Sequence, residues 1–214
     1  MEMLVQNYLA LTTLLCGYFI GSISFGVVMA KIYGINIFKV NSGNPGATNV
    51  NRSIGKWAGT MVFILDFLKG FIPTALVQHI FLSQYRDFTI NMNLILLTGL
   101  ILGHNFSIFL KFRGGKGVAT AMGGVLTLMP WCFAIGILIW LMIFKITRFV
   151  SLASLSFVAS LPLTSYLFGY SNETMVFCIG LMVVISLKHR ENIKRLWKGT
   201  EYRFSKSCRK NHDT

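Results

Sequence analysis

The longest uncharged stretch of the chain constrains its fold more than any other feature. No charged side chain interrupts residues Tyr8 to Ala30, and about 20 such residues are enough to cross a bilayer as a helix. Charged residues make up only 13% of the chain, about half their usual share in soluble proteins. The sequence therefore predicts an all-α, polytopic integral membrane protein, with a single membrane-embedded domain over residues 1–214.

Apolar stretches between polar loops predict seven transmembrane segments. The first is read as a span and not as a secretion signal, because no basic residue precedes it and no small-residue cleavage site ends it. The fourth is short, since its residues rise only about 18 Å against about 30 Å of hydrocarbon. The predicted segments are Leu4–Ala30, Trp57–Leu82, Ile90–Leu110, Val118–Met129, Trp131–Phe144, Val150–Phe168 and Thr174–Leu187.

The distribution of Lys and Arg decides how residues Val118 to Phe144 are arranged. One long helix broken at Pro130 would put the basic tail on the opposite side from Lys111 and Arg113. Two short or re-entrant segments leave only Arg86 in an outer loop. Because cytoplasmic loops collect Lys and Arg, the second arrangement is favoured. It predicts an outer N-terminus and a cytoplasmic tail.

The net charge of +13 does not by itself indicate a nucleic-acid partner. Most of the excess lies in short connections and in the basic tail from about residue 188, as is typical of the cytoplasmic side of membrane proteins. No group of His, Cys or carboxylate residues has metal-ligand spacing in the sequence. We therefore expect no nucleic acid, no metal and no cofactor.

The first polar loop, "NSGNPGATN", leads into a predicted short helix from Ala47 to Ile54. A flexible loop that enters a helix presents unpaired N–H groups to an anion. Arg52 lies four residues after Thr48 and therefore on the same helical face. The segment is either an anion-binding loop or an interfacial helix with a snorkelling arginine, and its spacing favours neither. Its candidate site residues are Ser42, Gly43, Asn44, Thr48, Asn49 and Arg52.

Three glycines surround Lys116 in the second loop, "FRGGKGVAT": Gly114, Gly115 and Gly117. The loop is not a Walker A motif, because that pattern requires Ser or Thr after the Lys. Lys116 can still neutralise a phosphate while neighbouring amides contact its oxygens. Positive charge flanking a membrane span explains the basic residues but not the three glycines, so a phosphate-binding loop is favoured.

The third loop, "KHRENIKRLWKGTE", has helical spacing. His189 and Asn192 lie three residues apart and share the face nearest the membrane. His189 is a candidate general acid or base, or a donor to an anion, whereas the later basic residues are typical of a helix that contacts anionic lipid. Ser151, at the start of the sixth segment, can cap its helix or contact a phosphate, and the spacing favours the cap.

Two charged residues lie inside a predicted span. Asp66 and Lys69 stand one helical turn apart in the second segment, where charge is costly and often functional. An intrahelical pair that neutralises itself explains them equally well, so they are assigned to the scaffold.

Six motifs follow one another between Gly21 and Glu201: "GSISFG", "SGNPGATNVNR", "LDFLKG", "GHNFSIFLKFRGGKGVAT", "RFVSLAS" and "HRENIKRLWKGTE". In this order they resemble the bacterial acyl-phosphate:glycerol-3-phosphate acyltransferase family, PlsY. The chain departs from the family pattern at Ser24 and Ser107, where proline is common. Those departures concern local helix bends and not the chemistry.

The resemblance implies a seven-span enzyme in the bacterial cytoplasmic membrane, with its active site on the cytoplasmic side. Such an enzyme transfers a fatty acyl group from a long-chain acyl phosphate to the 1-hydroxyl of glycerol 3-phosphate in phospholipid biosynthesis. The acyl chain of the donor would lie among the spans and membrane lipid. We expect the protein to act as a monomer.

The resemblance also implies roles for residues at matching positions. Arg52 and Lys116 are expected to neutralise phosphate charge. The hydroxyl groups of Ser42 and Ser151 are expected to contact phosphate oxygens. His189 and Asn192 are expected to orient the acceptor. The amides of residues 114–116 are candidates for stabilising the oxyanion or the leaving phosphate.

No side chain is assigned as the base that removes the acceptor proton. None of the four His residues is followed five residues later by Asp, as in soluble-headed glycerolipid acyltransferases. Our hypothesis is that a substrate phosphate takes the proton, with no covalent enzyme intermediate. Loss of turnover in His189→Ala with unchanged acceptor affinity would instead indicate His189 as the base.

Two other functions use the same loops. A transporter of an organophosphate or anionic lipid would need polar residues that continue through the spans, and the sequence offers few. A noncatalytic scaffold that binds anionic lipid does not explain why glycines cluster beside Lys116.

Overall fold

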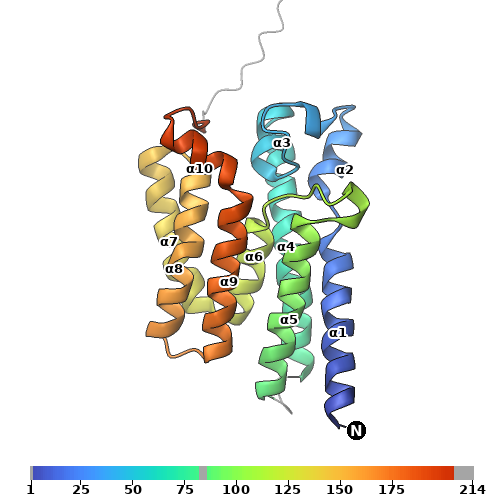
Figure 1. Cartoon of the computed structure of the whole chain (residues 1–214). Coiled ribbons are helices and arrows are strands. Elements are labelled where there is room, and N and C mark those ends of the chain that lie inside the picture. The colour runs from blue at the N-terminus through green and yellow to red at the C-terminus, as the bar shows by residue number, and fades with distance from the viewer. Residues whose placement is uncertain (1, 82–85, 205–214) are drawn as a thin grey trace, which may run out of the picture.

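The computed structural model describes residues 2–81 and 86–204. Over these ranges the chain forms a bundle of α-helices with two short 3₁₀ turns (Figure 1), which confirms the all-α prediction. The end of the predicted second span, at Leu82, and tail residues 205–214 lie outside the described residues. The helices are α1 (Glu2–Gly21), α2 (Phe25–Ile32), α3 (Ala47–Ser53), α4 (Lys56–Phe81), α5 (Arg86–Asn105), α6 (Val118–Leu128), α7 (Pro130–Thr147), α8 (Val150–Leu167), α9 (Asn172–Lys188) and α10 (Arg190–Trp197).

Not every predicted segment has the length of a complete span. In the described part of the chain, five stretches are long and apolar enough to cross a membrane: Leu4–Ile32, Lys56–His79, Asn91–Leu110, Pro130–Thr147 and Val150–Leu167. Helix α9 passes the same test only together with α10, and the two helices meet at an angle of 65°. Helix α6 has 11 residues and therefore rises only about 16 Å. Seven complete spans remain a prediction.

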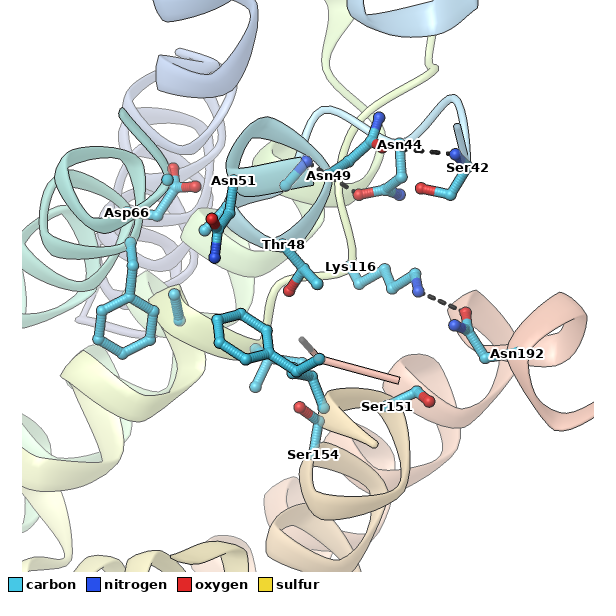
Figure 2. A pocket seen from close by; sticks show the side chains of 18 of the residues that line it. Ser42, Asn44, Thr48, Asn49, Asn51, Asp66, Lys116, Ser151, Ser154 and Asn192 are labelled. Atoms are coloured by element: carbon cyan, nitrogen blue, oxygen red, sulfur yellow. Dashed lines mark hydrogen bonds between the residues drawn. The ribbon is translucent and has the colours of Figure 1, made fainter. Parts of the chain in front are cut away.

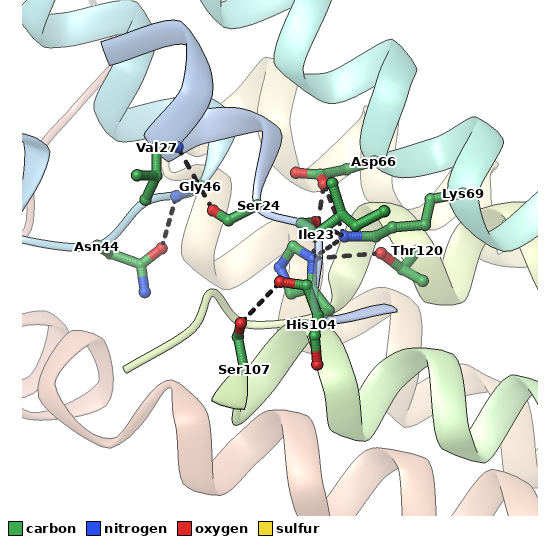
Figure 3. Close-up of polar contacts among 11 residues, drawn as sticks. Ile23, Ser24, Val27, Asn44, Gly46, Asp66, Lys69, His104, Ser107 and Thr120 are labelled. Atoms are coloured by element: carbon green, nitrogen blue, oxygen red, sulfur yellow. Dashed lines mark hydrogen bonds and ion pairs between the residues drawn. The ribbon is translucent and has the colours of Figure 1, made fainter. Parts of the chain in front are cut away.

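Two predicted segments are interrupted in the structure. The first was expected to be continuous, but α1 ends at Gly21 and α2 begins after Ser24, whose hydroxyl accepts a hydrogen bond from the Val27 amide at 3.4 Å. The third was expected to reach Leu110, but α5 ends at Asn105 and a 3₁₀ turn follows. The two breaks are joined, because Ser107 donates through Oγ to the Ser22 carbonyl oxygen at 2.7 Å (Figure 3).

Glycines bring α1 and α5 into close contact. A Cβ atom at Gly21 would lie 2.2 Å from the Leu100 carbonyl oxygen, and one at Gly103 would lie 2.0 Å from that of Tyr18. Small residues let helices approach in lipid, where packing and not water exclusion drives association. Helices α4 and α6 approach in the same way through their own glycines. These glycines thus permit the close packing of α1 on α5 and of α4 on α6.

The chain reverses direction between α6 and α7. Val118, at the start of α6, and Phe144, near the end of α7, line the same cavity. Pro130 begins α7, where its missing N–H costs nothing. The alternative of one long broken helix is therefore wrong, and the two-segment prediction is confirmed. Helices α3 and α10 lie at this end of the bundle, opposite the start of α1 (Figure 1).

Candidate active site

A cavity of about 470 Å³ opens where the three polar loops meet. Figure 2 shows the Lys116 side chain pointing toward Asn192 of α10. Nine of the twelve predicted site residues line this cavity: Ser42, Asn44, Thr48, Asn49, Arg52, Lys116, Ser151, His189 and Asn192. Gly43, Gly114 and Gly115 are not among its lining residues. The loops that the sequence singled out separately thus form one site.

A chain of hydrogen bonds leads from Lys116 to a buried carboxylate. Lys116 Nζ donates to Asn192 Oδ1 (Figure 2), and Asn192 Nδ2 donates to Glu201 Oε1 at 2.7 Å. Glu201, only 8% exposed, also accepts from Ser151 Oγ at 2.9 Å and from Arg195 Nε at 2.8 Å. Burial alone would raise the pKa of Glu201, but these hydrogen bonds lower it overall. The carboxylate therefore stays ionised and joins α8, through Ser151, to α10, through Asn192 and Arg195.

Lys116 is a partly buried cation with unused hydrogen-bonding capacity. Burial lowers the pKa of Lys116 to about 8, although Glu201 acts in the opposite direction. An ammonium has three N–H donors, and Asn192 Oδ1 is the acceptor that Lys116 has among the described residues. A phosphate at this position would supply both the missing acceptors and a counter-charge.

Arg52 also lines the cavity and lies against the segment that follows α10. Its guanidinium carbon is 4.8 Å from the centre of the Tyr202 ring, and Nη2 donates to the Tyr202 carbonyl oxygen at 3.4 Å. Burial lowers the pKa of Arg52, but arginine stays charged in proteins. Helix α3 therefore supplies a second cation to the same cavity. The short helix predicted from Ala47 to Ile54 is confirmed as α3.

The first loop is shaped by Asn49. This residue is 2% exposed, and its Nδ2 donates to the carbonyl oxygens of Ile37 at 3.3 Å and Val40 at 3.2 Å. Its Oδ1 accepts from the Ser42 amide at 3.4 Å (Figure 2). Since both amide hydrogens are engaged, Asn49 holds the loop so that Ser42 faces the cavity. Gly43 adopts a φ of 64° in the turn beside it, a conformation that glycine tolerates.

The paired glycines before Lys116 pack against α5. The Gly115 amide donates to the His104 carbonyl oxygen at 2.9 Å, and a Cβ at Gly114 would lie 2.0 Å from that same oxygen. The Gly115 amide is thus already engaged. The prediction that the amides of residues 114–116 together stabilise an oxyanion does not fit this arrangement.

His189 is buried as a neutral ring. Its Nδ1 lies 2.8 Å from the Ile185 carbonyl oxygen, and because a carbonyl only accepts, the ring proton is on Nδ1. Burial, together with the charge of Lys116, lowers the pKa of His189 to about 3. Such a ring is a weak base, but its Nε2 can accept a hydrogen bond from a hydroxyl group. The geometry therefore favours an orienting role.

Several cavity residues were not predicted as site residues. Glu201 was not singled out in the sequence, and Asp66 was assigned to the scaffold with Lys69. The ion pair exists, with 3.1 Å between Lys69 Nζ and Asp66 Oδ1, but Asp66 and His104 also line the cavity (Figure 3). Lining residues also missed are Asn51, Thr60 and Ser154. The motif "LDFLKG" was the available signal for Asp66.

Comparisons with known proteins identify the family. A family model described as glycerol-3-phosphate acyltransferase matches residues 11–199. The glycerol-3-phosphate acyltransferase of Aquifex aeolicus (strain VF5) is 44% identical over 197 residues, which cover 91% of this chain and 99% of the relative. That of Endomicrobium trichonymphae is 42% identical over 200 residues, which cover 93% of this chain and 96% of the relative.

Two solved structures have the same fold. The crystal structure of PlsY (YgiH), an integral membrane glycerol 3-phosphate acyltransferase, in its glycerol 3-phosphate form matches with a TM-score of 0.84 and 41% identity. It covers 92% of this chain and 96% of that one. The lysophosphatidic acid form matches with a TM-score of 0.80 and 41% identity, and covers 92% of this chain and 95% of that one.

These matches agree with the resemblance found in the six motifs. The family model covers most of the chain, and the relatives are similar over nearly its whole length. The chain therefore belongs to the glycerol-3-phosphate acyltransferase family.

Proposed function

We propose that this protein transfers a fatty acyl group from a long-chain acyl phosphate to the 1-hydroxyl of glycerol 3-phosphate, giving 1-acylglycerol 3-phosphate and inorganic phosphate. Membership of the family supports the acceptor and the product class. The observation that most supports the donor is that one cavity joins partly buried cations to an apolar wall. A phosphate and an alkyl chain are the two ends of an acyl phosphate.

The apolar wall of the cavity is formed by side chains of α4, α6 and α7: Phe63, Met122, Ile137, Trp140 and Phe144. Phe63 is 43% exposed, so this side of the cavity borders the outer face of the bundle. An acyl chain placed here has its carbonyl toward Lys116 and its alkyl carbons along apolar side chains.

The polar end supports a direct transfer. The 1-hydroxyl oxygen of the acceptor attacks the carbonyl carbon, the bond from that carbon to the phosphate oxygen breaks, and phosphate leaves with the bonding electrons. Lys116 and Arg52 offset the charge of the two substrate phosphates, and Ser42 donates to a phosphate oxygen. Ser151 does the same only when its hydroxyl turns away from Glu201, to which it donates in the structure. Held close together, the two substrates react as if within one molecule.

The acceptor proton moves to a phosphate oxygen. The His189 ring accepts a hydrogen bond from the 1-hydroxyl through Nε2, but with a pKa of about 3 it is too weak a base to hold the proton. The leaving phosphate is more basic and ends the reaction carrying that proton. No covalent enzyme intermediate is required, because the mixed anhydride is already activated.

We place the cavity on the cytoplasmic side of the bacterial inner membrane. Basic residues of three connections, Lys39, Lys111 and Arg148, lie in loops at the cavity end of the bundle, and such loops are usually cytoplasmic. Seven segments, with α6 a short or re-entrant one, then put the N-terminus outside. The protein acts as one domain, as a monomer, and without metal or cofactor.

The test is product formation by the purified protein in lipid. Palmitoyl phosphate, palmitoyl-CoA and palmitoylated acyl carrier protein are each offered with glycerol 3-phosphate. We expect 1-acylglycerol 3-phosphate and phosphate from palmitoyl phosphate alone, and formation of both products at least about 100-fold slower in Lys116→Ala. Folded protein that yields no product from any donor would overturn the proposal, and proteoliposome transport of glycerol 3-phosphate would then test the transporter reading.

A further inference from the structure

The ammonium of Lys69 is fully engaged by three acceptors. Its Nζ lies 2.8 Å from the Ile23 carbonyl oxygen, 3.1 Å from Asp66 Oδ1 and 3.0 Å from His104 Nδ1 (Figure 3). Three N–H groups meet three acceptors. His104 Nδ1 is an acceptor in this arrangement, because two N–H groups would repel each other at that distance. The ring proton of the neutral imidazole is therefore on Nε2.

The Nε2 end of the His104 ring lies beside the backbone of Gly115. A Cβ at Gly115 would lie 2.1 Å from Nε2 and 3.0 Å from both flanking carbons, Cδ2 and Cε1. A point that is near the nitrogen and equidistant from those carbons lies in front of the nitrogen, along its N–H direction. Only a glycine at position 115 lets the backbone pass this close to the ring.

This donor is unused within the described part of the chain. His104 Nδ1 contacts Lys69, Asp66 and Thr120, whereas Nε2 has no hydrogen-bond partner among residues 2–81 and 86–204. The side chain keeps 9% exposure and lines the cavity. This N–H group is therefore available to a ligand atom in the cavity.

His104 lies at the boundary between the two ends of the cavity. Its carbonyl oxygen holds the Gly115 amide, directly before Lys116 at the polar end. Its ring contacts Asp66 of α4 and Thr120 of α6, and both helices also contribute to the apolar wall. In an acyl phosphate, the carbonyl group lies between the phosphate and the alkyl chain, at the corresponding boundary.

We propose that His104 is a further catalytic residue, whose Nε2–H donates a hydrogen bond to the carbonyl oxygen of the acyl donor. The inference rests on the proposed function. When the acceptor hydroxyl attacks, negative charge develops on that oxygen, and a fixed donor stabilises it. The proton stays on Nε2 throughout. A neutral imidazole can serve as such an electrophile, and Lys69 fixes its tautomer.

Two substitutions of His104 separate this role from a structural one. In His104→Asn, Oδ1 takes the position of Nδ1 and still accepts from Lys69, but no donor reaches the cavity. In His104→Gln, Nε2 supplies a donor near its original position, while the acceptor for Lys69 is lost. We expect kcat with palmitoyl phosphate to fall about 10²-fold in His104→Asn, with KM for glycerol 3-phosphate within about twofold of wild type. His104→Gln is expected to keep more activity and to lose more thermal stability.

The proposal is overturned if His104→Asn keeps the wild-type kcat, or if folded His104→Gln is less active than His104→Asn. In either case His104 serves only to hold Lys69. Gly115→Ala provides a second test, since its methyl group occupies the position in front of Nε2. The Gly115→Ala variant is expected to have a lower kcat than the wild-type protein, and an unchanged kcat also overturns the proposal. Wild-type protein without turnover would instead reject the proposed function itself.

Discussion

Two lysines of this protein have opposite surroundings. Lys69, within α4, donates to three acceptors and is 6% exposed. Lys116, in the loop before α6, donates to Asn192, and burial lowers its pKa to about 8. A saturated ammonium joins helices but has no donor left for a ligand. An ammonium with free donors is destabilised until a ligand arrives, so the comparison separates a structural cation from a binding one.

The largest effect is expected from removing the saturated lysine. Lys69→Met leaves the carboxylate of Asp66 buried without a counter-charge, and breaking such a pair costs about 3–5 kcal/mol. The midpoint of thermal unfolding in detergent should fall accordingly. Adding Asp66→Asn should restore part of the loss. An unchanged midpoint in Lys69→Met would mean that the ion pair does not hold the bundle.

Removing the other lysine should affect activity and not folding. We expect kcat/KM with palmitoyl phosphate to fall about 10²–10³-fold in Lys116→Ala, because a cation at the reacting phosphate is lost. The unfolding midpoint should stay the same or rise. Arg113→Ala, an exposed cation three residues away, is the matched control and should retain activity. Equal losses in both variants would point to a general effect of charge.

Glu201 connects the binding lysine to the rest of the site, so its substitution should have an intermediate effect. Glu201→Gln replaces an ionised acceptor with an amide that cannot accept on both sides, which misplaces Asn192 and Lys116. A small misplacement at a reacting centre costs up to about 10²-fold. We expect kcat to fall about 10- to 100-fold, measured beside the unfolding midpoint. Full activity would show that Asn192 holds its position without the carboxylate.

The pH dependence should show the titration of Lys116. With a pKa of about 8, the lysine is charged below that pH and neutral above it, so kcat/KM for glycerol 3-phosphate should fall about tenfold per pH unit above pH 8. Because arginine keeps its charge, Lys116→Arg should lack this fall even if its plateau is lower. His189, with a pKa of about 3, should contribute no change between pH 5 and 8. The same fall in Lys116→Arg would assign it to another group.

The smallest effect is expected from a lysine outside both surroundings. Lys194 on α10 is 69% exposed and lies 3.4 Å from Glu191. Exposed pairs of this kind contribute about 0.5 kcal/mol or less. Lys194→Ala should leave the unfolding midpoint and kcat/KM near wild type. A large loss of activity would show that the cationic site extends along α10.

Helix positions followed from the apolar runs, but the helix breaks did not. Residues 22–24 contain neither charge nor proline, and Gly21 and Ser24, which can end one helix and cap the next, were read as part of one continuous span. The break is held by Ser107, which donates to Ser22 from 85 residues away. Such a contact exists only after α1 and α5 have packed, and it is therefore invisible to local sequence patterns.

The site was predictable where a local pattern carries the chemistry. A basic residue among glycines indicated Lys116, and helical spacing joined His189 to Asn192. Glu201 is a single acidic residue near a basic tail, and only the fold brings Ser151, Asn192 and Arg195 around it. The glycines before Lys116 were selected for phosphate binding, and their packing against α5 could not be read from the loop.

The apolar wall beside the cations has an energetic consequence for the donor. Moving a palmitoyl chain from lipid into water costs about 0.8 kcal/mol per methylene, or roughly 11 kcal/mol in all. A cavity that is polar at one end and apolar at the other avoids this cost, because the carbonyl can reach Lys116 while the alkyl chain stays among helices and lipid. In the proposed reaction, the acyl donor diffuses within the plane of the membrane and glycerol 3-phosphate diffuses through water. The cavity is where the two substrates meet.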